Sequence, residues 1–81
     1  MEYSELFALR ITKLCKQEGI TINRLATLAG LKQSTVDNII RGTSKNPKVR
    51  TLHKIAVVFG MTLSELLDFP ELNDYPIDDE D

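Results

Sequence analysis

Residues 21–41 of this 81-residue chain read TINRLATLAGLKQSTVDNIIR. The pattern predicts two short helices, over residues 22–28 and 33–41, with a tight turn between them. Thr21 stands where its side-chain oxygen can accept from the first amides of the first helix. Gly30 follows that helix, at the point where a left-handed backbone, which glycine adopts without steric cost, reverses the chain.

The helix over residues 33–41 has two different faces. Val36, Ile39 and Ile40 are spaced i, i+3, i+4, so they form one buried stripe. Burial of this stripe leaves a polar face on the opposite side that has no structural role of its own. Its members are Gln33, Ser34, Asp37, Asn38 and Arg41. Two helices joined in this way, the second with a free polar face, are typical of a helix-turn-helix.

The flanking sequence predicts three more helices. Residues 3–18 form one, with Ser4 as its N-cap. Residues 49–59 form another and end at a glycine. The last begins at Thr62, and Pro70 ends it because proline interrupts a continuing helix.

Apolar side chains recur at helical spacing on these three helices, so we expect them to pack into one core. They are Leu6, Phe7, Ile11, Leu14, Leu52, Ile55, Ala56, Phe59, Leu63, Leu66 and Leu67. His53 and Lys54 fall between the stripe positions and are expected to point outward. The last helix starts with a predicted capping box, in which Thr62 and Glu65 each satisfy the other's backbone amide.

These residues resemble one known family. Six positions of the helix-turn-helix stand at the spacing found in phage Cro and repressor proteins, the bacterial XRE-type family: Leu25, Ala26, Gly30, Leu31, Val36 and Ile39. The stretches GTSKNP at 42–47 and FGMTLSELL at 59–67 are similar to the loop and fifth helix of that family. The resemblance covers residues 5–68. It implies an all-α fold: a compact five-helix, lambda-repressor-like DNA-binding domain over residues 1–69, followed by a short acidic tail over residues 70–81.

The net charge of −2 conceals a separation of charge along the chain. Residues 1–60 hold all ten Lys and Arg against four Asp and Glu, a net charge of +6. Residues 61–81 hold eight Asp and Glu and no Lys or Arg, a net charge of −8. The basic part contains the helix-turn-helix, and clustered positive charge is the electrostatic signature of a nucleic-acid-binding surface. We therefore predict double-stranded DNA as a partner.

Other classes of function do not fit this composition. A chain of this length forms one small domain with little room for a deep catalytic cavity. The single histidine, His53, and the single cysteine, Cys15, form no catalytic or metal-binding set, so we expect a buried structural thiol, no enzyme activity, no cofactor and no metal. The longest apolar run, residues 55–59, is too short to cross a membrane, and no signal peptide is visible, so we expect a cytoplasmic protein.

The geometry of the major groove and the family resemblance together indicate which residues read bases. The first residues of a recognition helix reach the base edges, and Gln33 and Ser34 match base-reading positions of the family. Asn38 lies one turn further along the same face. The amides of Gln33 and Asn38 each carry a donor and an acceptor, which match adenine N7 and N6. Thr35 offers a methyl or a hydroxyl group, and Asp37 either accepts from cytosine N4 or only repels phosphates.

Affinity is expected to come from phosphate contacts, which fall into three groups. Basic side chains supply positive charge. The backbone amides that begin the helix over residues 22–28 lie at the positive end of its dipole. The loop over residues 42–47 supplies polar hydrogen-bond donors. The predicted contacts are Ile22, Asn23, Lys32, Arg41, Thr43, Ser44, Lys45, Asn46 and Lys48. For the loop, the alternative is a merely solvated connector.

Three features depart from the family pattern. Ile22 stands where the family commonly has a glutamine that braces the recognition helix, so either Gln33 is less constrained here or Ile22 contacts a thymine methyl group. Cys15 and Ile40 replace an Arg–Glu ion pair by an apolar contact, which need not cost stability. Lys32 stands where Ser or Thr usually caps the recognition helix, at an expected cost of about 1 kcal/mol.

The tail, PELNDYPIDDED, is acidic but also contains Leu72, Tyr75 and Ile77. We expect it to be partly disordered, or to dock on the domain or on a dimer partner. A tail of this charge could also compete with DNA for the basic face.

Function follows from the DNA-reading helix. One such helix reads only about 4 to 5 base pairs, so we expect a homodimer that binds a palindromic operator and regulates transcription as a repressor. The alternative is an antitoxin-like or adaptor module whose main partner is a protein held by the acidic tail.

Overall fold

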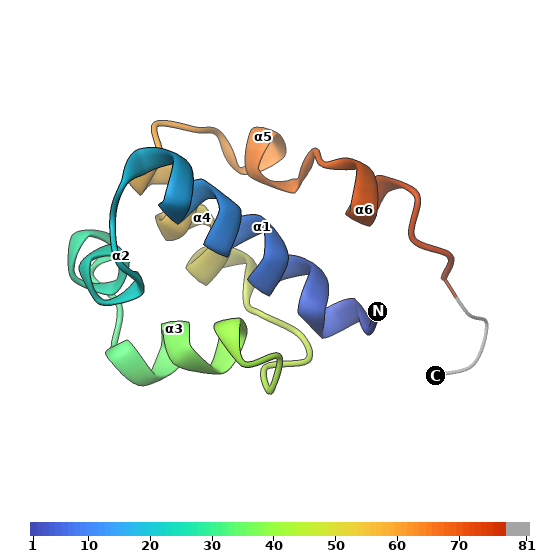
Figure 1. The fold of residues 1–81 in the computed structure, drawn as a ribbon, viewed down its shortest axis with the longest axis horizontal. Helices are drawn as coiled ribbons and strands as arrows, with labels where there is room; N and C mark the ends of the chain where they lie inside the picture. The colour runs from blue at the N-terminus through green and yellow to red at the C-terminus, as the bar shows by residue number, and fades with distance from the viewer. Residues whose placement is uncertain (78–81) are drawn as a thin grey trace.

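A computed structural model describes residues 1–77, and within them the chain forms six helices and no strand (Figure 1). The helices are α1 (Tyr3–Glu18), α2 (Ile22–Ala29), α3 (Gln33–Ile40), α4 (Val49–Val58), α5 (Leu63–Leu67) and α6 (Pro70–Asn73). α1 crosses the middle of the domain and packs against α3, while α4 packs against both α2 and α5. The prediction of an all-α fold is confirmed.

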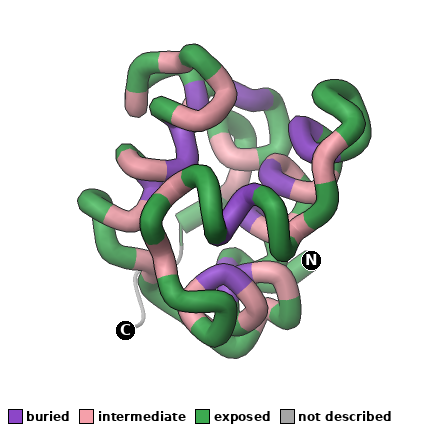
Figure 2. The backbone as a smooth tube through the Cα atoms, turned by 90° about the vertical axis from the view of Figure 1, so that its left-hand side faces the viewer, coloured by how far each residue is buried: buried purple, intermediate pink, exposed green. Residues whose placement is uncertain are grey.

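The core lies where α1, α2, α3, α4 and α5 meet. Its fully enclosed side chains come from all five helices and include Ile11, Leu25, Val36, Ile39, Ile55 and Leu66. Figure 2 shows buried segments on the inner sides of the helices and exposed segments outside them. Because Val36 and Ile39 are enclosed, the rotation of α3 about its axis is fixed, and its polar face must lie on the surface.

Local capping residues begin and end the helices largely as predicted. The Arg24 amide donates to Thr21 Oγ1 at 3.0 Å, which caps α2. Gly30 has φ +68° and turns the chain after α2. The capping box of α5 is also present: the Glu65 amide donates to Thr62 Oγ1 at 3.0 Å, and the Thr62 amide donates to Glu65 Oε1 at 2.8 Å.

Three helix ends differ from the prediction by one residue. α2 continues to Ala29, whereas α3 ends at Ile40 and α4 at Val58. The residues that follow α3 and α4 are their C-caps, with ψ near zero: −7° at Arg41 and 8° at Phe59. Phe59 is half-buried and packs against the core.

The predicted N-cap of α1 was wrong. Ser4 lies within the first turn of α1 and is buried, and the N-cap residue is Glu2. Glu5 Oε1 accepts from the Glu2 amide at 2.8 Å, so an acidic residue satisfies this helix end. His53 is exposed, as expected, and Lys54 is half-buried.

The chain has six helices where we expected five, because Pro70 begins a helix and does not end one. α5 ends at Leu67, and Pro70 occupies the first position of α6. Proline fits there since its fixed φ is already helical and its missing amide would have no partner in the helix. The Asn73 amide group donates to Asp68 Oδ1 at 2.8 Å and ties the end of α6 to the segment before it.

The first part of the expected tail is docked on the domain. Leu72 packs against the core, and the Tyr75 hydroxyl donates to the backbone oxygen of Met1 at 3.1 Å. The Tyr75 ring also meets the Tyr3 ring edge-to-face, with centroids 5.4 Å apart. Ile77 is 74% exposed. The acidic end of the tail, residues 78–81, lies outside the described residues, and the domain boundary after residue 69 stays a prediction.

One arginine joins α1 to α5. Arg10 Nε donates to the Leu66 carbonyl at 3.0 Å, and its Nη2 donates to the Glu65 carbonyl at 2.9 Å. Its guanidinium carbon lies 5.3 Å from the centroid of the Phe69 ring. Arg10 thus caps the carbonyl end of α5 and stacks on the residue that leads into α6.

The prediction of a buried structural thiol is confirmed. Cys15 is 4% exposed in the core, and Ile40 packs against the same cluster. Burial raises the pKa of the Cys15 thiol, because desolvation disfavours the thiolate, so the side chain acts as a small hydrophobic group. Within residues 1–77, no three His, Cys, Asp or Glu residues are grouped so as to hold a metal ion. None of the described helices has the length and hydrophobicity needed to cross a membrane.

Candidate nucleic-acid interface

The polar face of α3 lies on the surface and carries all five predicted base-reading residues. Gln33, Ser34 and Asn38 are exposed, and Thr35 and Asp37 are half-buried at its edges. No described element covers the exposed three, because α1 packs on the opposite, apolar side of α3. The polar face of α3 is therefore accessible from outside the domain.

Gln33 and Asp37 are joined by a hydrogen bond along this face. Gln33 Nε2 donates to Asp37 Oδ1 at 3.0 Å. This pair was not predicted, although the i, i+4 spacing of the two residues was a signal for it. Gln33 thus has a side-chain partner within its own helix, while a contact between Ile22 and a thymine methyl group stays a prediction.

A groove of about 460 Å³ runs beside α3, between the turn before it and the start of α4. It brings together residues predicted to read bases and residues predicted to contact phosphates. From these two sets its lining includes Lys32, Thr35, Asn38, Ser44, Asn46 and Lys48. The loop after α3 is therefore part of the same surface as the recognition helix, which favours the functional interpretation over a mere connector.

Hydrogen bonds hold this loop against the end of α3. The amides of Thr43 and Ser44 donate to the Asn38 carbonyl at 3.0 and 3.1 Å. The Thr43 hydroxyl donates to the same carbonyl at 3.1 Å, so its predicted role as a phosphate donor would require that bond to break. Gly42 has φ +74°, a left-handed backbone that favours glycine, and it lies beside Ser4 and Glu5 at the start of α1.

Two of the predicted phosphate-contacting cations, Lys32 and Lys48, line the groove beside α3. Lys32, Arg41, Lys45 and Lys48 are all exposed, as a phosphate-contacting role requires. Thr51 was not predicted to belong to this surface, but it lines the groove from the first turn of α4. The available signal was its place just after the basic loop, in the first turn of a helix, where free backbone amides favour a phosphate group.

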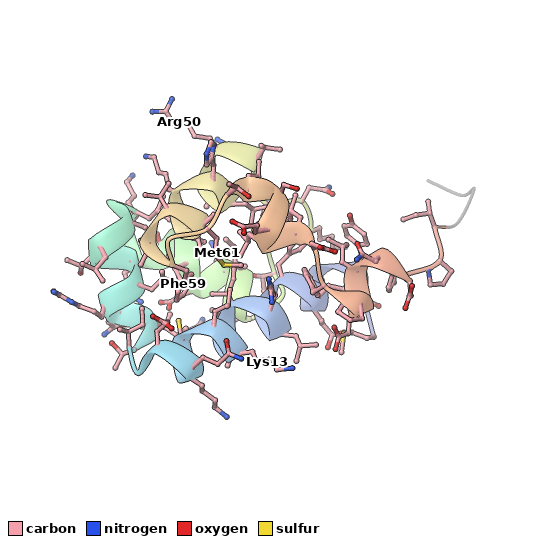
Figure 3. All side chains as sticks on the ribbon, turned by 90° about the horizontal axis from the view of Figure 1, so that it is seen from above. Lys13, Arg50, Phe59 and Met61 are labelled. Atoms are coloured by element: carbon pink, nitrogen blue, oxygen red, sulfur yellow. The ribbon has the colours of Figure 1, made fainter. Side chains whose placement is uncertain are left out.

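Arg50, also on the first turn of α4, was not assigned a role either. It is exposed and extends away from the body of the domain (Figure 3). Its position directly after Lys48 and Val49 was the available signal, and it adds one more cation at this end of α4.

The start of α2 was predicted to contribute backbone amides to the phosphate contacts. Ile22 is half-buried and packs against the core, so its backbone amide is the part best placed to meet a phosphate. Asn23 is exposed beside it. The side chain of Thr21 accepts from the Arg24 amide. The amides of Ile22 and Asn23 have no acceptor among residues 1–77.

Lys32→Ser is expected to raise the free energy of unfolding by about 1 kcal/mol. Lys32 has the extended backbone of an N-cap, φ −66° and ψ 142°, but its side chain makes no capping hydrogen bond. Urea unfolding followed by circular dichroism measures the gain. Lys32→Ala is the matched control, because it removes the same charge without supplying a cap. Equal stability of the two variants would contradict the prediction.

The comparison with known sequences agrees with this geometry. Residues 10–71 match the family model of the Cro/C1-type HTH DNA-binding domain. The chain belongs to this helix-turn-helix family. The family resemblance predicted from the sequence is therefore confirmed, over nearly the same residues.

Similar proteins include two bacterial regulators. The HTH-type transcriptional regulator PuuR of Escherichia coli (strain K12) is 34% identical over 67 residues, which cover 83% of this chain and 36% of PuuR. The HTH-type transcriptional regulator SinR of Bacillus subtilis (strain 168) is 30% identical over 66 residues, which cover 82% of this chain and 60% of SinR. The chain thus spans about a third of the length of PuuR.

Two solved structures share the fold. Prophage Lp1 protein 11 superposes with a TM-score of 0.80 at 39% identity, over 90% of this chain and 97% of that protein. The N-terminal DNA binding domain of SinR from Bacillus subtilis superposes with a TM-score of 0.73 at 29% identity, over 80% of this chain and 94% of that domain.

Proposed function

We propose that this member of the Cro/C1-type family is a sequence-specific regulator of transcription, a repressor that places α3 in the major groove of its operator. The observation that carries the proposal is the exposed polar face of α3, bordered by a groove with Lys32 and Lys48 in its lining. A helix with amide side chains on its outer face can pair with base edges, and flanking lysines can pair with the two phosphate backbones.

In this proposal the tasks are divided between two sets of residues. Gln33, Ser34 and Asn38 contact base edges, with Thr35 and Asp37 at the border of the contact. The phosphate contacts come from the lysines, from Arg41 and from the amides that begin α2 and α3. This division predicts that the first set governs which sequence is bound, whereas the second governs affinity and its dependence on salt.

We further propose that the protein binds as a symmetric homodimer. A single recognition helix contacts too few base pairs to select one site in a genome, and two helices on half-sites about 34 Å apart overcome this limit. The corresponding operator is palindromic.

A second candidate function is binding to another protein. The supporting observation is the exposed acidic edge made by Glu71 and Asp74, next to the exposed Ile77. In this antitoxin-like or adaptor role the main partner would be a protein. Co-purification of one partner, with no salt-dependent shift of DNA in a gel, favours this second function over the first.

Selection of bound sequences from a random DNA pool tests the main proposal. The wild-type chain is expected to enrich one palindromic site, and Gln33→Ala and Asn38→Ala are each expected to relax the preference at different base pairs. Lys13→Ala is the control, since this exposed residue of α1 belongs to neither predicted set. If both amide variants enrich the same site as the wild type, the base-reading assignment is wrong.

A further inference from the structure

We propose that Asp37 sets the base preference of Gln33 by holding the glutamine amide in one orientation. The proposal rests on the proposed function, in which Gln33 reads a base pair. Its observation is the 3.0 Å hydrogen bond from Gln33 Nε2 to Asp37 Oδ1 on the outer face of α3. Asp37 is thus a positioning residue, which acts on DNA through its neighbour.

The chemistry of the pair determines which end of the amide faces Asp37. An ionised carboxylate accepts hydrogen bonds and cannot donate one, so only the nitrogen end of Gln33 can face it. Rotation of the amide by half a turn would bring Oε1 against Oδ1, two acceptors with no proton between them. Asp37 therefore excludes the rotated amide.

Asn38, one turn along the same face, is not restricted in this way. Its Oδ1 lies 3.4 Å from the Thr43 hydroxyl. The proton of this hydroxyl is already donated to the Asn38 carbonyl at 3.1 Å, so no carboxylate fixes the asparagine amide as Asp37 fixes that of Gln33. The constraint is specific to Gln33.

The fixed amide matches adenine and mismatches guanine. With one N–H engaged by Asp37, Gln33 offers one acceptor, Oε1, and one remaining N–H. Adenine presents the N6 donor and the N7 acceptor in the major groove, which is the complementary pair. Guanine presents two acceptors, O6 and N7. The remaining N–H of Gln33 could donate to one of them, and Oε1 would then face the other acceptor without a hydrogen bond. Without Asp37, the amide could rotate and approach guanine through its NH₂ group.

This role differs from the two other roles open to Asp37. If Asp37 itself accepted from cytosine N4, its removal would change the preference at a separate C·G pair. If it only repelled phosphates, its removal would strengthen binding to every sequence by the same factor. The half-burial of Asp37 and the engagement of one of its oxygens favour the positioning role.

The test measures binding of the full chain to four duplexes by fluorescence anisotropy. The duplexes carry each of the four base pairs at the position where Gln33→Ala loses its preference. The wild type is expected to favour adenine over guanine by about tenfold. Asp37→Asn keeps the shape but can donate as well as accept, so the ratio should fall to about twofold. Asp37→Glu keeps the carboxylate and should retain most of the wild-type ratio.

The outcomes separate the inference from the proposed function. An unchanged adenine-to-guanine ratio in Asp37→Asn overturns the inference while the proposed function stands. If Gln33→Ala changes the preference at no position, then Gln33 reads no base, and both fail. Circular dichroism of both Asp37 variants serves as the folding control, because a loss of fold would lower binding to all four duplexes together.

Discussion

Replacing Arg10 by alanine is expected to lower the free energy of unfolding by about 2–3 kcal/mol. Arg10 makes two hydrogen bonds to the last carbonyls of α5 and stacks on the Phe69 ring. Hydrogen bonds from a charged group are worth about 1.5–3 kcal/mol each when buried, and partial exposure reduces this value. The cation–π contact adds about 0.5–1 kcal/mol. A domain of this length has about 4–12 kcal/mol of stability in total, so the variant should be measurably weakened.

Two further variants make the Arg10 prediction specific. Arg10→Lys keeps the charge but loses the planar fork, so we expect it to lose about half as much stability. Lys13→Ala alters an exposed residue on the same helix and should change stability by less than about 0.5 kcal/mol. Urea unfolding followed by circular dichroism provides the values. An Arg10→Ala variant as stable as Lys13→Ala would show that the contact with α5 contributes nothing.

The arrangement of the helix-turn-helix could be predicted from the sequence because its determinants are local. Thr21 and Gly30 act on the backbone beside them, and the spacing of Val36 and Ile39 turns the apolar side of α3 inward. The exposure of Gln33 and Asn38 follows from the same spacing, since a helix with one side buried must present the other. These predictions need no knowledge of what the rest of the chain does.

The incorrect predictions concern residues whose state depends on distant or competing partners. Ser4 has the chemistry of an N-cap, but the capping box of Glu2 and Glu5 begins the helix earlier, and the loop at Gly42 packs over Ser4. Pro70 can equally end or begin a helix, and here it begins α6, in which Leu72 packs against the core. Pattern alone does not contain such information.

The candidate site shows the same division. Its exposed residues could be named from the sequence, but the groove beside α3 forms only when the loop after α3 and the start of α4 come together. The bond between Gln33 and Asp37 was compatible with their spacing. Nothing in the sequence, however, chose it over the other partners that each side chain could take. Arg10 is a similar case, since its partners are more than 50 residues away along the chain.

Replacing Lys45 and Lys48 together by glutamine is expected to weaken DNA binding about 30-fold per subunit at 0.15 M salt. Both residues are exposed, and Lys48 lines the groove beside α3. Each neutralised phosphate contributes about 0.9 to the slope of log K against log salt, so the variant should lose about 1.8 from an expected total of about −4 to −5 per subunit. At 1 M salt the variant and the wild type should bind almost equally, because the lost term comes from counterion release. Titrations of one operator at four or more salt concentrations measure both quantities.

Two controls distinguish phosphate contacts from base contacts. Gln33→Ala should lower the affinity for the selected operator while leaving the salt slope unchanged, because it removes no charge. Lys13→Gln removes one positive charge from α1, on the edge of the domain opposite Arg50 (Figure 3), and should change neither quantity. If the Lys13 variant reduces the slope as much per charge as the double variant does, salt dependence reflects net charge alone. The loop after α3 would then have no special place in the contact with DNA.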